Sequence, residues 1–293
     1  MRLRDRLAKG EFVITCEAAP PKGTDVGPAL EEVRKLAPYV HAFNVTDLQS
    51  SVLRMSSWAL CALIKQAGYE PVVQMTCRDR NRLALQADLL GAWALGIENV
   101  LALTGDYPTL GDHPGARPVF DLDSVQLIAA VQLLNEGKDL AGNELEGKTD
   151  FFVGAVVNPG VEPLGPHVLK MRLKVKMGAK FFQTQAVYDP EAFKRFVQEV
   201  EGLGVPILVG IIPLKSARMA RFMNENIAGI NVPEAVIAEM ERAKTKEDRR
   251  KVSVEICARI IRKVKPYCQG IHLMPMGWEA LVPDILELAG INP

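Results

Sequence analysis

Eight short, apolar runs recur along the chain and constrain its fold more than any other feature. Most are apolar throughout instead of alternating, which is typical of strands covered on both faces. Segments with helical periodicity, such as 26–40, 82–96 and 191–204, lie between them. This order predicts parallel strands joined by crossover helices. The eight runs span residues 12–18, 42–48, 71–77, 99–106, 151–158, 181–188, 206–212 and 270–276.

The number of repeating units favours a closed barrel. A (β/α)8 barrel has about 250 residues, and this chain has 293. We therefore predict an α/β fold, a (β/α)8 TIM barrel that forms a single domain over residues 1–293. An open, doubly wound sheet is the alternative, because the strand number alone does not prove closure. The polar stretch 135–150 predicts an excursion before the fifth strand, and 243–265 predicts a long extra helix before the eighth.

The balance of charged residues limits the classes of molecule that this protein is expected to bind. Lysine plus arginine and aspartate plus glutamate both number 35, so the formal net charge is zero. Without a net field, we expect small molecules or proteins as partners and no nucleic acid. The charged segment 1–12 lacks the apolar core of a signal peptide, and no run is long enough to cross a bilayer. We therefore expect no membrane insertion and a location in the cytoplasm.

The cysteines and histidines show no metal-binding pattern. The five cysteines are scattered, with no CxxC pair and no spacing suited to zinc or an iron–sulfur cluster. We expect them to be reduced and mostly buried, as in a reducing cytoplasm. No two of the four histidines have metal-ligand spacing. The sequence therefore predicts no metal site.

Polar residues stand where the apolar runs stop. In a barrel of this type the active site lies at the carboxyl ends of the strands. A single residue of this kind is more often part of a capped turn or a solvated loop, but six strand ends that converge on one mouth favour a binding site. These residues are Glu17, Thr46, Asp47, Gln74, Thr76, Arg78, Asp79, Thr104, Asp106, Asn158, Gln183 and Gln185.

Two carboxylates and two glutamines carry most of the expected chemistry. Glu17 ends an otherwise apolar run, so its pKa should be raised and it could donate a proton near neutrality. Asp106 follows a glycine that permits close approach of the main chain. Two carboxylates in different environments are a common way to separate an acid role from an electrostatic one. Gln183 and Gln185 could read the edge of a heterocycle such as a pterin; the alternative is that only one of them faces the lumen and neither touches a ligand. As residues i and i+2 they should point the same way, with Thr184 opposite.

The helix after the fifth strand carries the candidate anion site. Lys170 and Lys174 are spaced i, i+4 and share a face. This face could meet a diphosphate, although a solvated lysine face is the more common explanation. Met274 and Met276 are expected to pack the last strand end, although a methionine can also line a ligand slot.

Taken in order, these segments resemble the methylenetetrahydrofolate reductase family. The motifs are CEAAPP at 16–21, NVT at 44–46, QMTCRDRNR at 74–82, LTGD at 103–106 and QTQ at 183–185. Each is weak alone, but the ordered set over nearly the whole chain is specific. The resemblance implies a flavin-containing (β/α)8 barrel that reduces 5,10-methylenetetrahydrofolate to 5-methyltetrahydrofolate by ping-pong hydride transfer. It also implies the short bacterial form, close to versions from anaerobic bacteria and without the C-terminal regulatory domain of eukaryotic members.

The resemblance also implies roles for individual residues. Glu17 is similar to the general acid that protonates N10 of the folate. Asp106 is similar to the aspartate placed beside flavin and pterin, and Gln185 to the glutamine that contacts the folate, with Gln183 beside it. The flavin-binding set implied or expected here is Thr46, Gln74, Thr76, Leu103, Thr104, Gly105, Asp106, Phe120, Asp123, Asn158, His167, Lys170 and Lys174.

The chain also departs from the family pattern. Ala18 and Ala19 replace an aromatic pair, Gln74 replaces a common histidine, and Trp278 stands near the place of an arginine thought to hold the folate. FAD is the expected flavin, with FMN as the alternative. NADH is one candidate donor, and a partner subunit that delivers electrons is another. A flavin-free, pterin-binding methyltransferase barrel and a non-catalytic barrel subunit are the alternative functions, and the oligomeric state stays open.

Overall fold

Eight parallel strands close into a barrel in the computed structural model, which describes residues 1–291. Each strand pairs with the next along the chain, and β1 pairs with β8 to complete the ring. The predicted (β/α)8 barrel is confirmed, and the open sheet is excluded. The strands are β1 (Val13–Ala18), β2 (Ala42–Val45), β3 (Pro71–Thr76), β4 (Asn99–Leu103), β5 (Phe152–Val157), β6 (Phe181–Ala186), β7 (Ile207–Ile211) and β8 (Gly270–Leu273).

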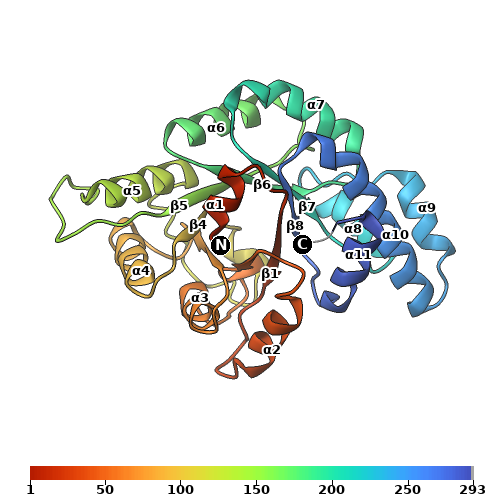
Figure 1. Ribbon diagram of the computed structural model, residues 1–293, viewed down its shortest axis with the longest axis horizontal. Coiled ribbons are helices and arrows are strands. Elements are labelled where there is room, and N and C mark those ends of the chain that lie inside the picture. Colours follow the sequence, from red (N-terminus) through yellow and green to blue (C-terminus); the bar gives the residue numbers. More distant parts are fainter. Residues whose placement is uncertain (292–293) are drawn as a thin grey trace.

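Helices surround the ring of strands (Figure 1). Three of them stand between β7 and β8, and the longest confirms the extra helix expected at 243–265. The stretch 135–150 is irregular, as expected, and is held by an antiparallel bridge between Lys138 and Glu144. The helices are α1 (Leu3–Ala8), α2 (Gly27–Leu36), α3 (Ser57–Gln66), α4 (Arg82–Ala94), α5 (Ser124–Glu136), α6 (Gly165–Lys176), α7 (Pro190–Val200), α8 (Ala217–Asn226), α9 (Glu234–Arg242), α10 (Lys246–Val264) and α11 (Val282–Ala289).

Two apolar layers form the core. The larger one lies between the strands and the outer helices, which explains why the strands are apolar on both faces. The smaller one fills the amino-terminal end of the barrel, where Leu3 and Leu7 of α1 pack on the first residues of several strands. There the ring of Phe181 stacks on Phe152 with centroids 5.2 Å apart. This end is therefore filled, and only the carboxyl end of the barrel can hold a ligand.

A bulge interrupts the pairing of β6 with β7. Gln183 pairs with Leu208, but Ala186 pairs with Gly210, so three steps on β6 face two on β7. An extra residue of this kind breaks the alternation of side chains. The expectation that Thr184 points away from Gln183 and Gln185 is therefore wrong, because all three line the same cavity.

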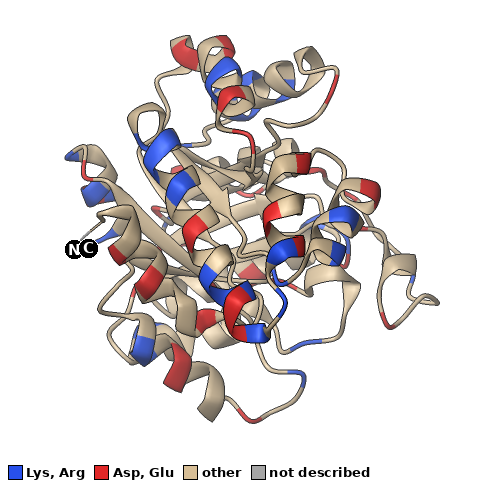
Figure 2. Cartoon of the chain, turned by 90° about the vertical axis from the view of Figure 1, so that its right-hand side faces the viewer, with Lys and Arg blue, Asp and Glu red and all other residues tan. Residues whose placement is uncertain are grey.

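Charges are interspersed over the outside of the molecule. Figure 2 shows the side that carries α8 to α11, where acidic and basic segments alternate. Arg221 pairs with Glu234 at 3.2 Å and with Glu241 at 2.8 Å on this side. Exposed pairs of this kind stabilise a fold by less than about 1 kcal/mol each. Among the helices of residues 1–291, none has the length and apolar character needed to span a membrane.

Candidate active site

A cavity of about 460 Å³ lies at the carboxyl ends of the strands. Its walls come from six consecutive strand ends, β1 to β6, and from β8, α6 and the first residue of α5. The volume falls in the range of small-molecule and cofactor sites, about 300–1,000 Å³. The residues predicted from sequence that line it are Glu17, Asp47, Gln74, Thr76, Arg78, Leu103, Thr104, Gly105, Asp106, Asn158, His167, Lys170, Lys174, Gln183 and Gln185.

Glu17 faces this cavity from the end of β1. Burial raises the pKa of its carboxyl group to about 7, and hydrogen bonds with the side chains of Gln49 and Gln74 limit the rise. Loss of water disfavours the charged form, whereas bonds to the carboxylate favour it. A carboxyl group with this pKa is protonated in a large fraction of molecules at neutral pH, so Glu17 can donate a proton.

Gln183 belongs to a buried polar network at the floor of the cavity. Its amide exchanges hydrogen bonds with the amide of Asn44, at 2.8 and 3.1 Å, and donates to Thr15 Oγ1 at 3.3 Å. Thr15 Oγ1 also contacts His272 Nδ1 at 2.9 Å. Burial lowers the pKa of His272 to about 3, so the ring is neutral. Since its polar atoms already have partners, Gln183 shapes the floor, whereas Gln185 has only one side-chain bond, to the amide of Ala186.

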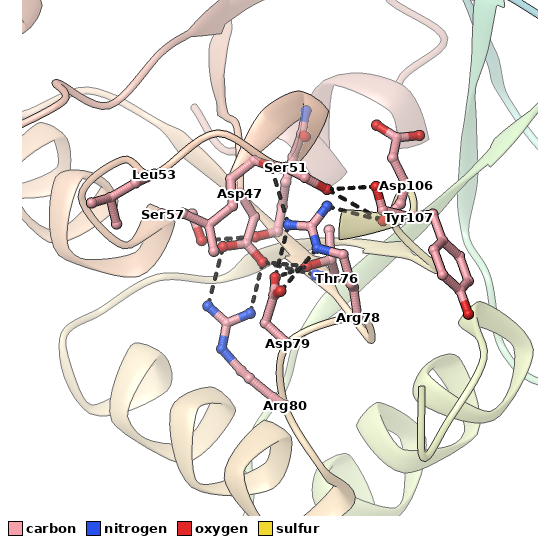
Figure 3. A network of polar contacts seen from close by, with 12 residues as sticks. Asp47, Ser51, Leu53, Ser57, Thr76, Arg78, Asp79, Arg80, Asp106 and Tyr107 are labelled. Atoms are coloured by element: carbon pink, nitrogen blue, oxygen red, sulfur yellow. Dashed lines mark hydrogen bonds and ion pairs between the residues drawn. The ribbon is translucent and has the colours of Figure 1, made fainter. Parts of the chain in front are cut away.

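Asp106 stands on the exposed rim, on the loop after β4. The preceding Gly105 has a φ of +96°, and a Cβ there would meet the Cβ atoms of Arg78 and Thr76 at 3.0 and 3.1 Å. Only glycine fits such a conformation and such close packing without strain. Arg78 donates to the main-chain carbonyl of Asp106 at 3.3 Å (Figure 3). The main chain at Asp106 is therefore held, and the exposed residue lines the mouth of the cavity.

Asp47 lines the cavity and anchors a salt-bridge network in its wall. Its carboxylate accepts from the amide and the hydroxyl of Thr76, at 2.9 and 3.0 Å, and from both terminal nitrogens of Arg80, at 2.8 and 3.1 Å (Figure 3). The Asp47 side chain is fully buried. Because its oxygens are already engaged, this strand-end residue fixes the β2 and β3 ends relative to each other.

Lys174 brings a buried cation to the opposite wall. Its Nζ donates to the carbonyl of Val156 at 2.7 Å, and the residue is only 5% exposed. Burial, together with the nearby charge of Lys170, lowers the pKa of Lys174 to about 8. A buried cation without a bonded carboxylate is stabilised by an anionic ligand. The solvated lysine face that is common on such helices is not what α6 forms here, because α6 turns Lys174 inward.

Three residues of the predicted flavin-binding set do not line the cavity. Thr46 is buried and its amide donates to the Ala18 carbonyl, so it continues the strand pairing beyond β2. Phe120 packs on Tyr107 instead. Asp123 caps α5 through the amides that follow it, and its carboxylate lies 3.7 Å from Lys170. In the structure, these three residues take part in local hydrogen bonds and packing. The strand-end pattern or the resemblance had predicted that they lie near a ligand.

Trp278 also lies elsewhere. It lines a separate hollow with Glu279 and Asp284, beside α10 and α11.

Met274 lines the main cavity, whereas Met276 is 48% exposed. The expectation that Met276 packs the strand end is therefore wrong, because the chain leaves the barrel after Met274.

Several cavity residues were missed in the sequence. Gln49 lies in a loop, Ser124 begins α5, and Thr184 reaches the cavity only because of the bulge. The sequence analysis treats the histidines only as candidate metal ligands, although the position of His272 inside a predicted strand is a signal that its side chain lies in the barrel lumen.

Within residues 1–291, no three His, Cys, Asp or Glu side chains are grouped as a metal site would require. All five cysteines are free and buried, as predicted.

Comparison with known protein families shows which family this chain belongs to. Residues 2–290 match the family described as methylenetetrahydrofolate reductase. The chain belongs to the methylenetetrahydrofolate reductase family. "Methylenetetrahydrofolate reductase 2" of Schizosaccharomyces pombe is 27% identical over 99% of this chain and 47% of its own length. "5,10-methylenetetrahydrofolate reductase" of Pectobacterium carotovorum is 26% identical over 71% of this chain and 66% of its own.

The alignments with these reductases cover only part of each reductase's own length. "Probable methylenetetrahydrofolate reductase (NADPH)" of Caenorhabditis elegans is 24% identical over 80% of this chain but only 34% of its own length. The alignments thus span between about a third and two thirds of these three relatives. Among solved structures, a protein of Clostridium thermocellum described as binding two copies of 5-methyl-5,6,7,8-tetrahydrofolic acid superposes with a TM-score of 0.62 and 16% identity, over 98% of this chain and 97% of its own. That likeness supports the shared barrel fold.

Methylenetetrahydrofolate reductases are generally flavin-dependent, and the residues of this cavity fit a flavin nucleotide. Lys174, Lys170 and His167 on α6 form a basic wall, and no carboxylate of residues 1–291 forms an ion pair with the buried Lys174. Uncharged donors and acceptors, among them Gln74 and Thr104, also line the cavity. Phosphate groups on the basic wall and a flat polar heterocycle against the strand ends match this arrangement.

Proposed function

We propose that this protein reduces 5,10-methylenetetrahydrofolate to 5-methyltetrahydrofolate with a bound flavin. Family membership supports the reaction class, and the observation that carries the proposal is Glu17, whose pKa of about 7 suits a proton donor in a cavity of cofactor size. The solved folate-binding protein that shares the fold supports a folate as the ligand class.

Each wall of the cavity has a role in this proposal. Glu17 donates its proton to N10 of the folate, so that the methylene bridge opens to a cation at N5. The carboxylate of Asp106, at the rim, favours that positive charge. Gln185 offers an amide to the pterin edge. These residues prepare the folate to accept a hydride.

The basic wall holds the cofactor in this proposal. Lys174, Lys170 and His167 bind its phosphate groups, and the flavin, when bound, would supply the hydride. We propose FAD as the flavin and NADH as the donor. Because one cavity of about 460 Å³ serves both reactants, donor and folate use it in turn, which gives a ping-pong order.

The test separates the two half-reactions of the purified, flavin-loaded protein. Glu17→Gln should slow the folate half-reaction by at least the 10²–10⁴-fold typical of a lost general acid, while flavin binding and reduction by NADH stay nearly intact. The control is Glu31→Gln on α2, whose side chain is 64% exposed and pairs only with Lys35. Equal loss of both half-reactions in the Glu17 variant would refute the assigned role.

An anaerobic visible spectrum of the wild-type protein decides between the broader alternatives. A flavin band that NADH bleaches and methylenetetrahydrofolate restores supports a self-sufficient reductase. Bleaching by dithionite alone points to a partner subunit that delivers electrons. No flavin binding at all, with retained folate binding, would replace this proposal with the pterin-binding methyltransferase.

A further inference from the structure

We infer that Arg78 is a positioning residue that sets Glu17 and Asp106 relative to each other, through the main chain of the loops after β2 and β4. This inference rests on the proposed function, because the two carboxylates are its acidic groups. Arg78 does not need to touch either carboxylate. It acts on the loop that carries Gln49 and on the main chain of Asp106.

The guanidinium of Arg78 joins three strand ends. One terminal nitrogen donates to the carbonyl of Leu48 at 3.1 Å, after β2, and the other donates to the carbonyl of Asp106 at 3.3 Å, after β4. Nε and Nη2 also bind the carboxylate of Asp79, at 2.9 and 2.8 Å, which fixes the plane of the group (Figure 3). The side chain is only 2% exposed. A planar fork of five donors can hold all three partners together, whereas a lysine has one nitrogen.

The loop after β2 needs such support. Leu48, Ser50 and Ser51 all have positive φ values, 47°, 54° and 57°. Residues other than glycine adopt this region at an energetic cost, so the surroundings must hold them there. Gln49 lies between Leu48 and Ser50 and lines the same cavity as Glu17, and its side-chain amide favours the charged form of the Glu17 carboxyl group. The strained main chain, held by Arg78 at Leu48, therefore decides where the Gln49 amide stands relative to Glu17.

The loops after β2 and β4 also touch directly. Ser51 Oγ donates to the carbonyl of Tyr107 at 3.2 Å. Gly111, farther along the β4 loop, lies so close to the Ser51 main chain that a side chain there would collide with it. These contacts join the loops to each other, and the Arg78 side chain ties the main chain of both loops to the end of β3 at once. Loss of the Arg78 fork would release Leu48 and Asp106 at these two points, while Asp47 still holds the β2 and β3 ends together.

The test is Arg78→Lys, which keeps the charge and removes the fork. A misplacement of about 1 Å can cost about 10²-fold in rate, so we expect a loss of this order in the folate half-reaction. Without the Gln49 bond, which favours the carboxylate, the pKa of Glu17 rises, so the midpoint of the pH profile moves upward. Flavin affinity and flavin reduction should stay within about twofold, because the basic wall is carried by α6 and by neither of the two loops that Arg78 holds.

Because Arg78→Lys keeps the positive charge, the midpoint of the pH profile can be interpreted directly. Since Arg78→Lys leaves the net charge unchanged, any shift reports position rather than a lost cation. Among the described residues, the other ionisable groups that line the cavity with Glu17 are Asp47, Asp106, His167, Lys170, Lys174 and His272. None of them is altered by the substitution.

Two variants serve as controls. Arg82→Lys is the same change four residues later, in a 57% exposed side chain that pairs with Asp121, near the end of the β4 loop beside α5, and contacts neither Leu48 nor Asp106; rate and midpoint should stay at wild-type values. Gln49→Leu removes the bond to Glu17 alone and should reproduce the upward midpoint shift. An Arg78→Lys variant whose midpoint stays at the wild-type value, while Gln49→Leu moves it, would overturn the inference. Should Arg78→Lys not fold, Asp79→Asn removes only the carboxylate that orients the guanidinium, and the same outcomes apply.

A second readout does not depend on catalysis. The pKa of Glu17 follows from the difference in unfolding free energy between Arg78→Lys and the double variant Arg78→Lys/Glu17→Gln, measured across pH. An upward shift relative to the same pair without the Arg78 change supports the inference. An inactive wild-type protein would sink the proposed function and leave this measurement valid, so the two failures are distinguishable.

Discussion

Replacing Glu17 with glutamine should change the free energy of unfolding by an amount that depends on pH. The folded-state pKa of Glu17 is about 7, above the ordinary value of 4.5. The unfolded chain therefore releases this proton at lower pH than the folded protein does. The stability contributed by protonated Glu17 is complete below about pH 4.5 and is lost as pH rises through about 7.

The size of the effect follows from the shift. A difference of about 2.5 pH units between the two states corresponds to at most about 3 kcal/mol over the full titration. The carboxyl group faces a cavity that water can enter, and solvent screening reduces this value. Between about pH 5 and pH 8 we therefore expect the wild-type protein to lose about 1–2 kcal/mol relative to Glu17→Gln.

Urea unfolding at several pH values in this range measures the difference. Glutamine has nearly the same shape and cannot ionise, so it isolates the titration. Glu31→Gln is the matched control, because Lys35 lowers the pKa of this exposed carboxylate, the direction opposite to that at Glu17. A difference between wild type and Glu17→Gln that is constant from pH 5 to pH 8 would refute the argument that burial holds Glu17 protonated.

Two further predictions concern the cofactor wall and the closed end of the barrel. Lys174→Met should weaken flavin binding by about 10–150-fold, the value of a hydrogen bond to a charged group of about 1.5–3 kcal/mol, and titration by flavin absorbance or fluorescence measures it; unchanged affinity would remove Lys174 from the phosphate site. Phe181→Ala should destabilise the protein by about 3–5 kcal/mol, since its ring is fully buried. Urea unfolding checks this, and a loss below about 1 kcal/mol would show that the end of the barrel repacks.

The strands were predictable because each is a local property of the sequence. A parallel barrel covers both faces of every strand, so each strand appears as an apolar run even without its partners. The predicted runs extended too far at their carboxyl ends, for example 42–48 against Ala42–Val45. The reason is chemical, because the last residues of such a run leave the sheet and turn their polar groups toward the cavity or into its supporting network.

The candidate site was predictable where a residue stands on a strand. Glu17 and Gln185 occupy strand ends, and Asp106 follows one, so barrel geometry places them at the mouth. The positions of loop residues could not be predicted from the strand pattern. Gln49 has no local signal, because its place depends on a left-handed main chain that contacts from β3 and β4 support. Thr184 depended on a bulge that only the pairing with β7 reveals.

By itself, the sequence determined the repeating strand and helix pattern, the acid at the end of β1, and the motifs that identify the family. Tertiary structure alone decided the pKa of Glu17, the burial of Lys174 and the span of Arg78 across three strand ends. The physical reason is that desolvation and hydrogen bonding depend on which distant segments surround a group. A linear pattern records which groups are present, and the fold decides how far each one is removed from water.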